Sequence, residues 1–239
     1  MCERFSTGSE PVNLISAGLI VLMALHALFV WIRSWHREPV QFLLAVLALA
    51  VGAGALAYHA VASDAVAVYE DVPLILFLLA CFMVILRRMY LIGRVGTVLI
   101  VALIVAIQAA FVVLVPPAQI SGGAFMTLLA ALYLMAGGLV IKARLGMNAD
   151  KGLTGMAAAR SDALHFPRLR AGYGLVVVGI IFALGLAAKA LDMPLCNRFA
   201  LGSHFIWHLA VALVVWRVLM ITTHYPTAPE VKARLDGAR

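Results

Sequence analysis

Charged side chains are scarce in this sequence. Only 12% of its 239 residues are Asp, Glu, Lys or Arg, 64% are hydrophobic, and the mean hydropathy is +1.04. A soluble domain is roughly 25% charged and about half apolar, so a soluble globule is excluded. The chain has room for seven apolar helices of about 20 residues, each able to cross a bilayer. We therefore expect residues 1–239 to form a single all-α, polytopic membrane domain with seven transmembrane helices.

Cysteine is rare as well. Cys2, Cys81 and Cys196 show no Cys-x-x-Cys spacing, which excludes a thiolate metal site and a disulfide framework. One bridge between Cys2 and Cys196 is compatible with both residues lying on one side of the membrane, but we favour three free thiols. The polar segment 1–10 carries acids in place of a basic region and does not resemble a cleavable signal peptide.

Apolar runs and basic residues together predict a topology. The runs cover residues 12–32, 40–62, 72–86, 95–115, 124–141, 173–191 and 201–221. Of the 18 Lys and Arg residues, all except Arg4, Lys189 and Arg198 fall on one side of these spans. The positive-inside rule assigns that side to the cytoplasm, so the N-terminus is expected outside and the C-terminus inside. The net charge of +7 then reflects topology and attraction to anionic lipids, and we expect no nucleic-acid partner.

Histidines and acids gather at the outer ends of the predicted spans. His204 and His208 are four residues apart, so both imidazoles lie on one helix face, and His59 closes the second span. Three such nitrogens and a water form the open coordination of a catalytic zinc. Histidines at helix ends also bond simply to water and carbonyls, and this interpretation stays open. The acids at the same end are Glu3, Glu10, Glu70 and Asp71.

Short motifs occur in order along the chain. They are CER at 2–4, EPVN at 10–13, YH at 58–59, EDVP at 70–73 and LGSHFIWH at 201–208. These motifs resemble the alkaline ceramidase family, most closely its bacterial ceramidase-like members. That family belongs to a superfamily of seven-helix membrane hydrolases that includes the adiponectin-receptor-like proteins. The last motif is the most specific of the five.

The resemblance implies a zinc-dependent amidase. Zn²⁺ would be held by His59, His204 and His208, and a zinc-activated water would attack the amide of a ceramide-like lipid, releasing a fatty acid and a sphingoid-type amine. Glu70 aligns with the family's Asp, and Asp71 is the alternative acid or base. The substrate would enter from the bilayer, at the extracytoplasmic face of a bacterial inner membrane. No obligate protein partner is implied.

Two departures from the family pattern, Glu70 in place of Asp and Ala55 in place of Ser, keep other functions open. The family places Ser four residues before the helix-two histidine, where its hydroxyl helps to stabilise an oxyanion, but this chain has Ala55. Hydrolysis of another lipid amide or ester, or a silent lipid-binding or receptor-like role with structural zinc, are therefore alternatives. Eukaryotic members also bind Ca²⁺. Glu3, Glu10 and Asn13 are the matching candidates here, although acids also simply favour a helix N-terminus.

Several further residues receive structural interpretations. Trp31 and Trp207 are interpreted as part of the interfacial aromatic belt. Lys189 and Asp192 are expected to pair, and residues 145–170 are expected to form a mobile basic loop on the anionic leaflet. Close helix packing is predicted at Gly52, Gly54, Gly137, Gly138 and Gly179.

Overall fold

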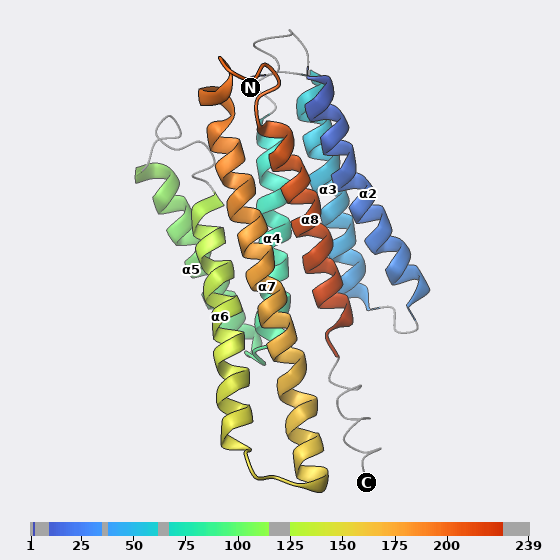
Figure 1. The fold of residues 1–239 in the computed structure, drawn as a ribbon, viewed down its shortest axis with the longest axis vertical. Coiled ribbons are helices and arrows are strands. Elements are labelled where there is room, and N and C mark those ends of the chain that lie inside the picture. The colour runs from blue at the N-terminus through green and yellow to red at the C-terminus, as the bar shows by residue number, and fades with distance from the viewer. Residues whose placement is uncertain (1, 3–9, 35–37, 62–66, 115–124, 227–239) are drawn as a thin grey trace.

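A computed structural model describes residues 2, 10–34, 38–61, 67–114 and 125–226. Within these residues the chain forms seven long helices (Figure 1). Their bounds are α2 Pro11–Arg33, α3 Pro39–Val61, α4 Val68–Arg88, α5 Arg94–Leu114, α6 Met126–Ala149, α7 Gly155–Leu195 and α8 His204–His224. Each is long and apolar enough to cross a membrane, which confirms the prediction of an all-helical, multi-pass protein.

The basic loop predicted for residues 145–170 is wrong. Helix α6 continues to Ala149, and after a short turn α7 runs without interruption for 41 residues. A helix of that length measures about 61 Å, longer than the roughly 40–45 Å of a whole bilayer. The hairpin of α6 and α7 therefore projects beyond the other helices (Figure 1). A hydropathy profile detects only the apolar part of such a helix, whereas buried polar residues such as Arg168 show that its packing continues beyond that part.

The helices close into a ring. Each packs against the next along the chain from α2 to α8, and α8 returns to lie beside α2 (Figure 1). Helix α8 also contacts α3 and α4 and is the most buried of the seven, whereas α5 is the most exposed. The N-terminal end of α8 therefore lies next to the C-terminal end of α3 and the start of α4.

Glycines allow α3 to approach its two neighbours. A Cβ at position 52 would contact the backbone of Val21 on α2, and one at position 54 would overlap the carbonyl oxygen of Tyr69 on α4. Small residues of this kind let membrane helices pack backbone to backbone. The prediction is thus confirmed for Gly52 and Gly54, and also for Gly138 and Gly179, which lie against tyrosine rings. It is wrong for Gly137, which has open space around it.

A disulfide between Cys2 and Cys196 ties the start of the chain to the segment before α8. The preferred interpretation of three free thiols is therefore wrong for these two, while Cys81 is free and buried. The bridge needs the two cysteines at the same end of the ring, and only the packing of α8 beside α2 brings them there. Sequence separation alone, 194 residues, does not reveal it.

Asp192 holds the beginning of α8. Its carboxylate accepts hydrogen bonds from the backbone N–H groups of Cys2, Ser203 and His204, each at 2.9 Å. A carboxylate on the free N–H groups of a helix start is a cap, here supplied from α7 and not from the adjacent chain. The expected pair of Lys189 with Asp192 is wrong, because Lys189 pairs with Glu70 and Asp71 on α4.

The opposite end of the ring is tied by Arg88, the last residue of α4. Its guanidinium bonds to the carboxylate of Glu38 at 2.9 Å and to the carbonyl oxygens of Thr222 and Tyr225. These partners flank the start of α3 and the end of α8. Arg88 therefore joins three helices at the end farthest from the histidines.

Candidate metal centre

Four buried side chains converge at one end of the ring. His59 lies in the last turn of α3, Glu70 in the first turn of α4, and His204 and His208 in the first two turns of α8. One ligand atom from each lies within 4.8 Å of all the others. The predicted meeting of the three histidines is confirmed, and the group is suited to hold a metal ion.

The distances fit a tetrahedral ion. Metal–nitrogen bonds of about 2.0–2.1 Å place tetrahedral ligand atoms about 3.3 Å apart. The Nε2 atoms of His59 and His208 are 3.0 Å apart. Oε1 of Glu70 lies 3.4 Å from Nε2 of His204 and 3.7 Å from Nε2 of His208. These three edges bracket the ideal value, and the other separations within the group are no larger than 4.8 Å.

Hydrogen bonds from α2 orient two of the rings. The hydroxyl of Ser16 donates to the carbonyl oxygen of Asn13 at 3.0 Å, so it accepts from Nδ1 of His208, 2.9 Å away. The carboxylate of Glu10 accepts from Nδ1 of His59 in the same way. Both rings therefore carry their proton on Nδ1 and direct the lone pair of Nε2 inward. Two lone pairs facing each other at 3.0 Å repel one another, and a cation between them removes the conflict.

The third histidine, His204, also directs a buried ring nitrogen that suits a cation. Nε2 of His204 is buried, and its contact with Oε1 of Glu70 at 3.4 Å lacks hydrogen-bond geometry. Buried polar atoms normally have a partner, because leaving one unsatisfied costs roughly 1–3 kcal/mol. A metal ion bound by the other two histidines would also satisfy this nitrogen. The donor set of three imidazoles and one carboxylate suits zinc.

The sequence analysis did not identify Ser16 as a hydrogen-bond partner of a histidine, and it assigned Glu10 to a calcium site. The structure places the carboxylate of Glu10 against Nδ1 of His59, so Glu10 contacts the metal group itself. A signal was present, since Glu10, Asn13 and Ser16 recur at three-residue intervals at the start of an otherwise apolar helix. Glu3 lies outside the described residues, so the calcium site predicted from these acids stays a prediction.

The carboxylate of Glu70 is held from its other side. The indole N–H of Trp207 donates to Oε1 at 2.8 Å, and Nζ of Lys189 lies 3.5 Å from the same oxygen. The interpretation of Trp207 as an interfacial belt residue is wrong, because its side chain is 1% exposed. Asp71, the second acid proposed for catalysis, does not belong to the metal group and pairs with Lys189 at 2.9 Å.

An aromatic wall continues from Trp207. The rings of Phe125 and Phe182 pack on it, with centroids 5.4 and 5.7 Å away. The ammonium of Lys189 lies over Trp207 at 4.9 Å and over Phe125 at 5.4 Å. Cation–π contact of this kind stabilises a buried ammonium beside its carboxylates. The site therefore has histidines on one side and an apolar, aromatic surface on the other.

Ala55 leaves one place in the site without a polar group. It is buried one turn before His59, and side chains four residues apart lie on the same helix face. A serine at position 55 would therefore direct its hydroxyl to the side of α3 that carries His59. With alanine, α3 provides no hydroxyl there.

Comparison with known proteins adds no assignment. No family model matches this chain, and no curated protein or solved structure matches it.

Proposed function

We propose that this protein is a zinc-dependent hydrolase of membrane lipids and that its substrate carries an amide of the ceramide type. The observation that carries the proposal is the inward direction of the histidine Nε2 atoms around one buried point, with Glu70 completing the group. The amide and the sphingoid class come from the sequence motifs that resemble alkaline ceramidases. They go beyond what the metal group itself supports.

The chain's own residues have distinct tasks in this proposal. A zinc ion held there would act as a Lewis acid and supply an activated water. Glu70, whose Oε1 lies within 3.7 Å of two histidine nitrogens, accepts a proton from the attacking water and passes it to the leaving amine. Lys189 keeps Glu70 in place and supplies positive charge where negative charge develops on the substrate.

The proposed orientation places this site outside the cytoplasm. The distribution of Lys and Arg supports it, because the side opposite the histidines carries most of the basic residues. The disulfide between Cys2 and Cys196 supports it independently, since disulfides persist in oxidising compartments such as the bacterial periplasm. A lipid of the outer leaflet would bring its amide to this depth, with its chains among the apolar helices.

Metal content and turnover together test the proposal. Purified protein should contain one zinc per chain by elemental analysis and should release fatty acid from a labelled ceramide series. His208→Ala should lose both zinc and activity, and Glu70→Gln should lose activity. His26→Ala is the matched control, because His26 lies outside the metal group on α2 and contacts Trp216. Full zinc content with no turnover of any lipid amide would count against an amidase.

A structural zinc site is the second candidate. Four protein ligands that close a tetrahedron are typical of structural zinc, whereas catalytic sites keep one position for water. Glu70 already lies at ligand distance, and Ala55 lacks the hydroxyl that would assist chemistry. Under this alternative the protein binds lipid without cleaving it, and Ala55→Ser creates no activity. Under the hydrolase proposal, Ala55→Ser raises turnover, because one more oxyanion donor is worth roughly 10²–10³ in rate.

A further inference from the structure

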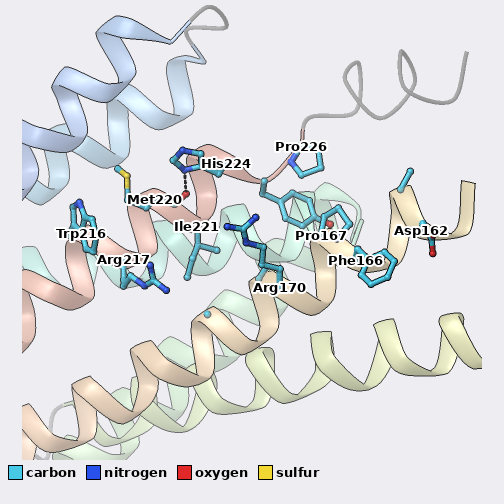
Figure 2. A pocket seen from close by; sticks show the side chains of 14 residues that line it. Asp162, Phe166, Pro167, Arg170, Trp216, Arg217, Met220, Ile221, His224 and Pro226 are labelled. Carbon is cyan, nitrogen blue, oxygen red and sulfur yellow. Dashed lines mark hydrogen bonds between the residues drawn. The ribbon is translucent and has the colours of Figure 1, made fainter. Parts of the chain in front are cut away.

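A cavity lies at the end of the bundle opposite the histidines. It is a groove of about 740 Å³ between α7 and α8. Figure 2 shows Arg217 and Trp216 at one end of it, Arg170 in the middle and Asp162 at the other end. Its volume falls in the range of about 300–1,000 Å³ that is usual for small-molecule sites.

The groove is amphipathic and positively charged. Arg170 and Arg217 both line it, and neither pairs with a carboxylate among the described residues, in contrast to Arg88 and Lys189. The rest of the lining is largely apolar, with Met220 and Ile221 beside the two arginines and Phe166 between Arg170 and Asp162 (Figure 2). Two unpaired guanidinium groups on an apolar floor are suited to an anion that carries hydrocarbon, because Arg binds phosphate oxygens in a bidentate manner.

The depth of the groove matches a lipid headgroup. Arg217 is 13 residues after His204 on α8, or about 20 Å along the axis, and Arg170 is 19 residues before Lys189 on α7, or about 28 Å. A hydrocarbon core is about 30 Å thick. If the histidines lie at one edge of the core, Arg170 therefore lies near the other edge, where phosphates are found. Arg217 lies about 10 Å inside that edge, and its long side chain can extend from there toward the phosphates.

We propose that this groove binds an anionic phospholipid of the leaflet at this end of the bundle, with its phosphodiester between Arg170 and Arg217. Basic pockets between transmembrane helices on the cytoplasmic side commonly take such headgroups. Asp162 at the far end opposes a second negative charge and favours a monoanionic lipid such as a phosphatidylglycerol. The proposal is independent of the zinc site, since none of its residues belongs to the metal group.

Lipid binding is measured by native mass spectrometry of the full-length protein, titrated with dioleoyl phosphatidylglycerol or dioleoyl phosphatidylcholine. Wild type should retain one phosphatidylglycerol in clear preference to phosphatidylcholine. Arg170→Gln/Arg217→Gln should lose roughly 30-fold in affinity for it, which corresponds to about 2 kcal/mol for two juxtamembrane arginines. Arg33→Gln/Arg94→Gln removes the same charge at the same end but outside the groove, and should bind as wild type does.

Three results would overturn the proposal. The first is an equal loss of phosphatidylglycerol affinity in the groove variant and in Arg33→Gln/Arg94→Gln. The second is equal retention of phosphatidylglycerol and phosphatidylcholine by wild type. The third is displacement of the bound lipid by millimolar glycerol phosphate, which would identify a site for free anions. If Arg170→Gln/Arg217→Gln fails to fold, the single variants are used, each with an expected loss of roughly 5-fold. Arg170→Lys/Arg217→Lys keeps the charge but loses the bidentate geometry, so its affinity should lie between those of wild type and Arg170→Gln/Arg217→Gln.

Discussion

The contact between Glu10 and His59 predicts a specific loss of metal affinity. Glu10→Ala removes the acceptor that fixes the proton of His59 on Nδ1, and the ring can then turn or place its proton on the inward nitrogen. Residues that orient a histidine ligand typically change metal affinity by about 10–100-fold. Glu10→Gln keeps an acceptor oxygen but loses the charge. A hydrogen bond to a charged group contributes roughly 1 kcal/mol more than a neutral one, so we expect about a 5- to 10-fold loss for this variant.

The assay is competition for zinc between the purified protein and a chromophoric chelator of known affinity, with calcium buffered at a low level. Ser16→Ala, which removes the acceptor for His208, should weaken binding by about 2- to 10-fold because that bond is neutral. Asp162→Asn is the matched control, since it removes an acid outside the metal group. Unchanged zinc affinity in both Glu10 variants, together with lost calcium binding, would refute the reasoning and support the calcium assignment of Glu10.

Three further predictions concern the frame around the site. Gly54→Ala should destabilise the protein by about 1–3 kcal/mol and reduce its zinc content, because the added methyl collides with the Tyr69 carbonyl next to Glu70. The control is Gly137→Ala, which has open space around it and should be neutral or stabilising in the same thermal unfolding assay. Asp192→Ala should lower the unfolding temperature, because three buried N–H groups lose their acceptor. Added reductant should lower the unfolding temperature of this variant further only if the Cys2–Cys196 disulfide still forms in it. Lys189→Met should reduce turnover by at least 10-fold while zinc content stays near one per chain; loss of zinc instead would assign Lys189 a purely structural role.

The two candidate functions also predict different effects of removing Lys189. Among the described residues, its ammonium contacts the carboxylates of two acids and the faces of two aromatic rings. In a hydrolase, that ammonium assists the developing oxyanion and its removal slows the reaction. In a structural site, where no lipid is cleaved, it only secures Glu70, and its removal changes stability alone.

Much of this protein follows from its sequence alone. Long apolar runs determine seven helices, because a bilayer offers no other partner for backbone polar groups. The spacing of His204 and His208 places both on one face of α8, and the helix order brings them to the same end of the bundle as His59. Hydropathy, residue spacing and helix order are properties of the sequence itself, so a single sequence is enough to predict them.

Only the tertiary structure decided which side chains meet across helices. Glu10 and Ser16 reach the histidines because α8 closes the ring against α2, a contact between residues more than 190 positions apart in the case of Ser16 and His208. Trp207 is indistinguishable in sequence from an interfacial tryptophan, and its burial follows from the packing of α8 inside the ring. The bridge from Cys2 to Cys196 and the cap by Asp192 have the same origin. Hydropathy and spacing describe one helix at a time, whereas these contacts depend on the rotation and order of several helices at once.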